Sequence, residues 1–502
     1  MKDLQFNLED ILERQGARLY FVGIGGIAMS AVANIAARFG YEVSGSDSRD
    51  IYSPAKDVLD ASKISYFVGY SAEKVKKSPA DLFILSAGED TSNPEVQYIV
   101  ENNLPRVGLA ELLYFLAKDK LRVVVTGTHG KSTTTGLLGH LFKNLDDSSF
   151  MAGGVLQNYN SNFHTGGGHY FIFEGDEYKE QFDDPTPKFH YYKADVLVLT
   201  NLEYDHPDLF ESFEALEQEF RLLIETLPED GLIVYNADDA AISKLVHESN
   251  LSKASFGIHN EADFRIENVK YDSDFTTLEV INKFSKTVSS KLLGQTEQYK
   301  IQLPGEINVY NSLAAIATLR TLGFAQEQIA LDLLTYKGIK RRFEIVGQKN
   351  GVTIVDDYAH HPTAVRETLE AARLRFFPPL PLGEGRGEGP KGKLWVVFEP
   401  HTFSRTKATL DDLVKSFDAA DEILISDIYP AREKASDATI SSADVVKAIK
   451  SAIRNPQSKI RLVHKKQQAL DIIKTESKSG DAVIVMAVGN FNRLAYELKE
   501  VL

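Results

Sequence analysis

Residues 126–135 read Thr-Gly-Thr-His-Gly-Lys-Ser-Thr-Thr-Thr and directly follow an apolar run at 121–125. A strand, two glycines, a Lys-Ser pair and a helix-compatible run are the layout of a phosphate-binding loop. Glycines let N–H groups approach phosphate oxygens, Lys131 adds positive charge, and the Ser132 hydroxyl can ligate Mg²⁺. A glycine-rich turn without a ligand is the alternative. The sequence therefore predicts that a nucleotide contacts Gly127, Thr128, His129, Gly130, Lys131, Ser132 and Thr133.

The composition is that of a globular chain, because 43% of its 502 residues are hydrophobic and 25% are charged. This length predicts about three domains. The formal charge of -15 argues against a nucleic-acid partner, and the absence of cysteine excludes disulfides and thiolate catalysis. The chain shows neither a signal-peptide core nor an apolar run of membrane-spanning length, so we expect a cytoplasmic protein without a membrane partner.

The first segment, residues 1–119, predicts a β–α–β unit. A strand is expected at 18–22, a helix of small residues ending at 39, and a second strand at 41–44. Asp47 takes the position of the acidic residue that meets a ribose hydroxyl. The glycine-rich turn is expected to meet a diphosphate through Gly23, Ile24, Gly25, Gly26 and Ile27.

This turn departs from the dinucleotide pattern Gly-x-Gly-x-x-Gly, because Ala28 and Ser30 occupy the region of the third glycine. A diphosphate is therefore better supported than a redox cofactor. A nucleotide-binding redox or regulatory module stays as a different-class alternative.

The second segment, residues 120–336, alternates strand-like and helical runs, which predicts a mainly parallel sheet flanked by helices. Glu174 and His206 follow two of the predicted strands and are candidate Mg²⁺ ligands beside Ser132. The alternative for Glu174 is a helix N-cap or a solvated charge, and the alternative for His206 is a packed loop histidine. An antiparallel meander is expected between 262 and 303, followed by a helix that carries Asn308 and Asn311 on one face. These two amides could read an adenine edge, although a helix-capping role for Asn308 is equally open.

The third segment, residues 337–502, again repeats an apolar strand followed by a polar cluster, which predicts a second doubly wound sheet. The three cations at 340–342 suit a γ-phosphate clamp or a solvated turn. A Pro/Gly-rich stretch at 377–393 is expected to form an exposed loop.

Taken together, these elements resemble the Mur ligases, the ATP-dependent amino-acid-adding enzymes of peptidoglycan synthesis. The resemblance covers essentially the whole chain, and the motifs occur in the family's order. They are Gly-Thr-His-Gly-Lys-Ser at 127–132, the strand ends at Glu174 and His206, the helix with Asn308 and Asn311, Lys-Arg-Arg-Phe at 340–343 and Asp-Asp-Tyr-Ala-His-His-Pro-Thr at 356–363.

The resemblance implies three α/β domains: a Rossmann-like UDP-binding domain (1–119), a central P-loop ATPase-like domain (120–336) and a Rossmann-like amino-acid-binding domain (337–502). It implies ATP and Mg²⁺ as cofactors and UDP-N-acetylmuramate and L-alanine as substrates, joined through an acyl phosphate by a monomer or homodimer. The implied catalytic residues are Lys131, His206, Arg342 and His360. The nucleotide would also meet Asn308, Asn311 and Arg342, the uridine would lie near Asp47 and Ser86, and the amino acid would lie against Tyr358, His360 and Arg405.

The resemblance is not uniform within the family. The C-terminal motifs at 399–406 and 427–433 are similar to those of alanine-adding members, whereas 174–178, 188–192 and 201–210 look more like members that recycle a whole L-Ala-γ-D-Glu-diaminopimelate tripeptide. Ile307 stands where a histidine is usual and Thr402 where some alanine-adding members carry arginine. The carboxylate clamp would therefore rest mainly on Arg405.

Overall fold

The computed structural model describes residues 7–204, 209–272, 274–284, 294–377, 392–431, 433–434, 436 and 438–502. The chain divides into two compact units. One comprises Met1–Arg265, Asn282–Gly294 and Leu313–Asp332, and the other Ile266–Ile281, Gln295–Ser312 and Leu333–Leu502. The domain limits at 119 and 336 stay a prediction.

The N-terminal sheet has five parallel strands in the order β3-β2-β1-β4-β5, which matches the first five strands of the Rossmann order. Tyr20 and Val22 of β1 pack into one apolar cluster and Leu19 and Phe21 into another, so the sheet is covered on both faces. The strands are β1 (Arg18–Val22), β2 (Glu42–Asp47), β3 (Ser65–Val68), β4 (Leu82–Leu85) and β5 (Arg106–Val107). The helices are α1 (Leu8–Leu12), α2 (Ile27–Arg38), α3 (Ala55–Ala61), α4 (Ala72–Lys77), α5 (Pro94–Glu101) and α6 (Leu109–Leu116).

The central sheet has ten strands in the order β17-β16-β15-β14-β13-β12-β6-β9-β7-β8. Its strands from β14 to β7 run parallel, whereas β8 pairs antiparallel with β7 and β17 with β16. The antiparallel pairing of β16 and β17 agrees with the predicted meander, but β15 joins the main sheet by pairing parallel with β14. The meander is therefore a continuation of the central sheet.

The central elements lie as follows. The strands are β6 (Leu121–Thr126), β7 (Ser149–Leu156), β8 (Ser161–His164), β9 (Tyr170–Glu174), β12 (Val196–Leu199), β13 (Leu232–Asn236), β14 (Ser252–Gly257), β15 (Phe264–Tyr271), β16 (Thr276–Asn282) and β17 (Thr296–Ile301), with a separate hairpin of β10 (Lys179–Gln181) and β11 (Asp184–Pro187). The helices are α7 (Lys131–Asp146), η1 (Lys188–His190), α8 (Phe213–Glu225), α9 (Ala240–His247), α10 (Glu306–Thr321) and α11 (Gln326–Leu333).

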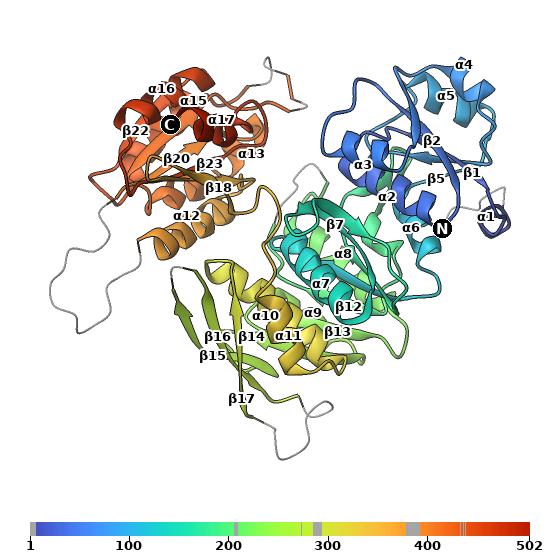
Figure 1. Ribbon diagram of the computed structural model, residues 1–502, viewed down its shortest axis with the longest axis horizontal. Coiled ribbons are helices and arrows are strands. Elements are labelled where there is room, and N and C mark those ends of the chain that lie inside the picture. Colours follow the sequence, from blue (N-terminus) through green and yellow to red (C-terminus); the bar gives the residue numbers. More distant parts are fainter. Residues whose placement is uncertain are drawn as a thin grey trace. The chain divides into compact units, whose positions relative to one another are not determined.

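The C-terminal sheet has the order β18-β19-β23-β20-β21-β22 and is parallel except for β18. Alternate residues of β20 pack into two different apolar clusters, one with α12 and α15 and one with α16 and α17. Helices therefore cover both faces of this sheet, as Figure 1 shows for α12 and α16. The strands are β18 (Glu344–Lys349), β19 (Val352–Asp357), β20 (Leu394–Phe398), β21 (Glu422–Ser426), β22 (Lys459–Val463) and β23 (Ala482–Met486). The helices are α12 (Pro362–Phe376), α13 (Phe403–Ala408), α14 (Leu410–Leu413), η2 (Val414–Phe417), α15 (Ser442–Ala452), α16 (Lys466–Glu476) and α17 (Leu494–Val501).

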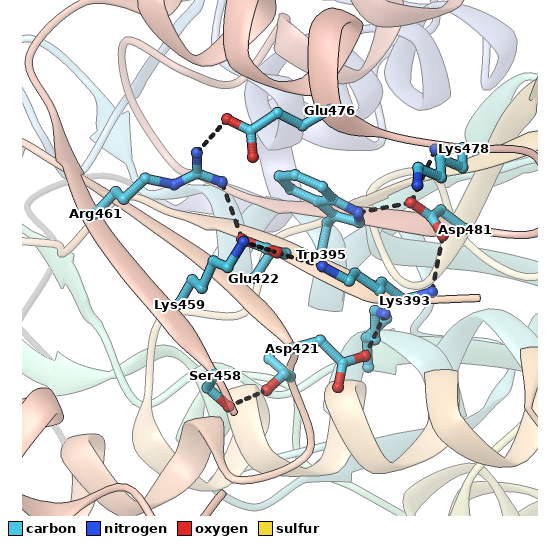
Figure 2. Close-up of polar contacts among 12 residues, drawn as sticks. Lys393, Trp395, Asp421, Glu422, Ser458, Lys459, Arg461, Glu476, Lys478 and Asp481 are labelled. Atoms are coloured by element: carbon cyan, nitrogen blue, oxygen red, sulfur yellow. Dashed lines mark hydrogen bonds and ion pairs between the residues drawn. The ribbon is translucent and has the colours of Figure 1, made fainter. Parts of the chain in front are cut away.

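A buried carboxylate, Glu422, organises a polar cluster at the amino ends of these strands (Figure 2). Glu422 is 1% exposed and accepts hydrogen bonds from Lys393 at 2.7 Å and Arg461 at 3.0 Å. The Arg461 guanidinium also lies over the ring of Trp395, whose indole N–H donates to Asp481 at 2.9 Å. This cluster lies at the sheet edge opposite the one that carries the predicted amino-acid residues.

The predicted insert at 377–393 falls mostly on residues 378–391, which lie outside the described chain. Over the described ranges, no helix is both long and apolar enough to cross a membrane.

Candidate active site

The predicted phosphate loop forms a tight turn between β6 and α7. Gly130 at its end has φ +81°, and Gly127 at its start has φ +137°, conformations that favour glycine. A Cβ on Gly127 would lie 2.2 Å from the Thr200 hydroxyl oxygen and 2.7 Å from the Asn201 carbonyl oxygen. Gly127 therefore allows the loop to approach the segment that follows β12.

The backbone of this loop is joined to residues 200–203. The N–H of Thr128 donates to the Asn201 carbonyl at 2.9 Å, and the N–H of His129 donates to the Asn201 side chain at 2.7 Å. The Thr128 hydroxyl donates to the Glu203 carbonyl at 2.9 Å and accepts from the Glu203 N–H at 2.8 Å. The first turn of α7, which begins at Lys131, is thus the part of the loop best placed to offer N–H groups to a phosphate.

Lys131 is the central charge of this site. Its ammonium donates to the Gly127 carbonyl at 2.7 Å and pairs with the Glu177 carboxylate at 3.0 Å, and the two side chains are only 12% and 6% exposed. Burial alone would lower the pKa of Lys131, but Glu177, Asp176 and Glu174 act against it, and the pKa is raised. The lysine therefore stays charged, as a phosphate ligand must.

Ser132 and Glu174 come together as the sequence predicted. The Ser132 hydroxyl donates to one Glu174 oxygen at 2.7 Å, and the Gly153 N–H donates to the other at 2.6 Å. Burial, together with the nearby charge of Asp176, raises the pKa of Glu174 to about 7. A hydroxyl and a carboxylate that lies among other acidic groups are the oxygen ligands that Mg²⁺ prefers, so these residues fit this ion. The third predicted ligand, His206, lies outside the described residues.

The N-terminal glycine turn is hydrogen-bonded to the end of β2. The N–H groups of Gly23 and Ile24 donate to the Ser46 carbonyl at 2.9 and 3.0 Å, and the N–H of Gly25 donates to the Asp47 carboxylate at 2.9 Å. Gly26 is the N-cap of α2, and Ile27 opens its first turn. The helix start at Ile27, rather than the glycines before it, is therefore the part of this turn best placed to meet a diphosphate.

Asp47 and Ser86 both lie beside this turn. A Cβ on Gly25 would fall 2.7 Å from an Asp47 carboxylate oxygen, and one on Gly23 would fall 2.9 Å from the Ser86 Cβ. Asp47 is the last residue of β2 and Ser86 directly follows β4, so both lie at the carboxyl ends of parallel strands, where ligands of open α/β sheets bind. The structure thus groups the predicted uridine residues at one sheet edge.

Asn308 and Asn311 lie one helical turn apart in α10. The Asn308 amide donates to the Pro304 carbonyl at 2.7 Å, and the Asn311 amide donates to the Asn308 side chain at 3.2 Å. Asn308 lies within the first turn of α10 and its amide acts as a donor, so this contact is not the N-cap contact that the sequence offered as the alternative. Adenine binding by the pair stays a prediction.

The C-terminal unit gathers the predicted amino-acid residues around Tyr358. The guanidinium groups of Arg341 and Arg342 lie 5.1 and 5.3 Å from the centre of the Tyr358 ring. Their turn is held by Asp357, which accepts N–H groups of Phe343 and Ala359, each at 2.7 Å. The cations predicted as a phosphate clamp therefore adjoin the amino-acid residues within this unit.

His360 is held in one neutral form. Its Nδ1 lies 2.9 Å from the Tyr358 carbonyl oxygen, which can only accept, so Nδ1 carries the proton and Nε2 has a lone pair. Burial, with the positive charge of Arg405, lowers the pKa of His360 to about 3. The adjacent His401, whose ring centre is 5.4 Å away, also has a lowered pKa because of burial and Arg405. Both imidazoles are therefore uncharged near neutral pH.

Thr402 is the N-cap of the short helix that carries Arg405, and its hydroxyl accepts the Arg405 N–H at 3.4 Å. Its φ is +58°, and its own N–H donates to the Tyr429 carbonyl at 2.8 Å. At this position, where some alanine-adding members have arginine, the threonine shapes the turn that presents Arg405.

Three residues of these sites were not singled out from the sequence: Glu177, Asn201 and His401. Each belongs to a polar cluster that follows a strand, which was the available signal. Their partners come from other strands, and those partners are visible only in the folded chain.

Family models match the three segments in order: the "Mur ligase family, catalytic domain" at 18–121, the "Mur ligase middle domain" at 125–319 and the "Mur ligase, glutamate ligase domain" at 341–489. The UDP-N-acetylmuramate–L-alanine ligase of Clostridium acetobutylicum is 33% identical over 97% of this chain and 98% of its own length.

Two solved structures are similar over almost their full length. The UDP-N-acetylmuramate-alanine ligase of Thermotoga maritima has a TM-score of 0.75 at 23% identity and covers 96% of this chain and 98% of its own. A murein peptide ligase of Psychrobacter arcticus has a TM-score of 0.68 at 25% identity, with coverage of 97% and 98%. Given the matching phosphate loop, sheet topology and near-complete coverage by these relatives, the chain belongs to the Mur ligase family.

Proposed function

We propose that this chain joins L-alanine to UDP-N-acetylmuramate at the expense of ATP, in peptidoglycan biosynthesis and in the cytoplasm. The observation that carries the proposal is the buried Lys131, which lies among three carboxylates at the start of α7. A charged lysine and Mg²⁺-type ligands at a helix N-terminus suit a bound triphosphate. The relatives named for this activity match along the whole chain. This family membership also argues against the redox or regulatory alternative.

In the proposed reaction, a carboxylate oxygen of the UDP-sugar attacks the γ-phosphorus of ATP, and ADP leaves. The amine of L-alanine then attacks the acyl carbon, phosphate leaves, and the amine loses a proton. Two anions meet in the first step, so Lys131 would stabilise the charge that gathers on the transferred phosphoryl group. Ser132 and Glu174 would hold Mg²⁺, which supplies further neutralising charge when bound. The roles of His206 and Arg342 stay predictions.

The C-terminal cluster suits the amino acid. Arg405 can bind a carboxylate through two parallel N–H bonds, and the Nε2 lone pair of His360 can accept a hydrogen bond from an α-amino group. Because His360 is neutral, it does not repel the ammonium form of the substrate. Tyr358 would close one side of this position.

Lys131→Ala tests the proposal. Purified wild type should release phosphate from ATP only when UDP-N-acetylmuramate and L-alanine are both present, and the variant should release none. Substitution of Lys143, on the same helix, serves as the control and should keep the rate. Turnover by Lys131→Ala would refute the assigned role, and a wild type that shows no phosphate release with these substrates would refute the function.

The second candidate is ligation of the L-Ala-γ-D-Glu-diaminopimelate tripeptide, favoured by the motifs at 174–178 and 201–210 and by the similarity to a murein peptide ligase. Side-by-side assays with L-alanine, glycine, L-serine and the tripeptide would separate these activities. The oligomeric state, monomer or homodimer, can be measured by light scattering on the same preparation.

A further inference from the structure

Asn201 makes an unusual pair of contacts with one residue of the phosphate loop. Its side-chain oxygen accepts the His129 N–H at 2.7 Å, and its side-chain nitrogen donates to the His129 carbonyl at 3.0 Å. The side chain thus uses both polar groups of a single backbone residue, as a neighbouring strand does in a β-ladder. Its own carbonyl also accepts the Thr128 N–H at 2.9 Å.

This pair of contacts suits asparagine near neutral pH, where an ionised aspartate could only accept hydrogen bonds. It needs an acceptor and a donor at the end of one short side chain, which asparagine has and which aspartate and leucine lack. The adjoining Thr200 hydroxyl adds a third bond to His129, because it donates to the same carbonyl at 2.8 Å. The loop conformation between Gly127 and Gly130 is therefore determined largely by the segment after β12.

This conformation decides where the nucleotide-binding groups point. Gly130, which follows His129 directly, is the N-cap of α7, and Lys131 and Ser132 form the first turn. A loop that is already ordered loses little conformational freedom when a ligand binds, so its affinity is higher than that of a mobile loop. Asn201 belongs to the segment after β12 and not to the loop itself. Its side chain contacts the loop at His129, two residues before Lys131.

We infer that Asn201 is a positioning residue for ATP: it clamps the phosphate loop so that the first turn of α7 is preformed for the triphosphate. This inference rests on the proposed binding of ATP at this loop. It assigns Asn201 a part in nucleotide affinity and none in binding the UDP-sugar or the amino acid.

Asn201→Asp and Asn201→Ala test the inference. Asp keeps the shape and the acceptor but places an oxygen against the His129 carbonyl, and Ala removes both bonds. We expect the Kd for Mg²⁺ with a non-hydrolysable ATP analogue, measured by calorimetry, to rise about 10- to 100-fold in each variant. The Kd for UDP-N-acetylmuramate should stay within about twofold, since its predicted residues lie on another sheet.

A pH series separates positioning from a general structural effect. In Asn201→Asp, protonation of the new carboxyl restores a donor toward His129, so nucleotide affinity relative to wild type should recover as the pH falls. Asn201→Ala should show no such recovery. Asn102→Asp is the matched control, because the Asn102 amide also donates to a backbone carbonyl, that of Tyr98 at 2.8 Å, but far from the loop.

A measurement on the wild type keeps the inference testable if both variants fail to fold. Hydrogen exchange of the free protein should show a protected His129 amide before any nucleotide is added. An unprotected His129 amide, unchanged nucleotide affinity in the variants, or an equal loss of UDP-N-acetylmuramate binding would overturn the inference. A wild type that binds no nucleotide would instead refute the proposed function.

Discussion

Glu180 offers a sharp test of how burial controls ionisation in this fold. It lies on the β10–β11 hairpin, is fully buried, and accepts the N–H groups of Ala110 at 2.6 Å and Glu111 at 3.3 Å. A Cβ on Gly108 would fall 2.1 Å from the same carboxylate oxygen, so the close approach depends on glycine. Burial raises the pKa of Glu180 from 4.5 to about 8, although Lys188 and the two N–H groups lower it.

The sign of the effect follows from the proton balance. Between pH 4.5 and about 8, the folded protein keeps a proton on Glu180 that the unfolded chain has released. The contribution of this carboxyl to the unfolding free energy is fully present below its pKa in the unfolded chain. It is lost as the pH rises through its pKa in the folded protein. A difference of one bound proton changes the unfolding free energy by about 1.4 kcal/mol per pH unit. Between pH 5 and 8 the unfolding free energy therefore falls by at most about 4 kcal/mol.

Glu180→Gln should remove this pH dependence. Glutamine stays neutral, and its carbonyl oxygen can still accept both N–H groups. Urea unfolding followed by circular dichroism at pH 5, 6.5 and 8 should show a shallower decline for the variant, which becomes more stable than wild type at pH 8. Glu229→Gln, at an exposed position, is the control and should keep the wild-type slope. Equal slopes for Glu180→Gln and wild type would refute the reasoning.

Three further predictions concern other parts of the chain. Gly127→Ala forces a Cβ against the Thr200 hydroxyl at positive φ and should lower the unfolding free energy by about 2 kcal/mol and weaken nucleotide binding; unchanged melting and titration curves would contradict it. Arg405→Lys should raise the KM for L-alanine at least about tenfold but leave the KM for ATP unchanged, because lysine cannot pair bidentately; an equal rise in both would argue against the assignment. Glu422→Ala removes the shared partner of Lys393 and Arg461, which are partly exposed, while Arg461 keeps Glu476, and should destabilise the protein by about 1 to 2 kcal/mol in chemical unfolding; an unchanged unfolding free energy would show that the cluster contributes little.

The sequence predicted the strand–loop–helix unit of the phosphate loop because its signals are local. Apolar runs followed by glycines or polar residues identified β1, β6, β9 and β20 within a residue or so of their observed ends. The parallel arrangement then implied that residues at the carboxyl ends of strands converge. The hydrogen bond between Ser132 and Glu174 is what that rule predicts.

Other features escaped the sequence because they depend on strand order. Asn201 meets His129 only because β12 lies beside β6, and nothing at either position alone indicates the partner. The same holds for Glu177, which pairs with Lys131 across 46 positions of the chain. The sequence also did not predict that β14 and β15 extend the central sheet. The alternation of apolar and polar residues along a strand does not show which other strand it pairs with.

The amino-acid order by itself thus determined the fold class, the two glycine turns and the residue types gathered at each sheet edge, because backbone propensity and side-chain chemistry act over a few neighbouring positions. Tertiary structure alone decided which donor bonds to which acceptor and which carboxyl groups are buried away from solvent. Desolvation and hydrogen-bond geometry depend on atoms that folding brings together from distant parts of the chain.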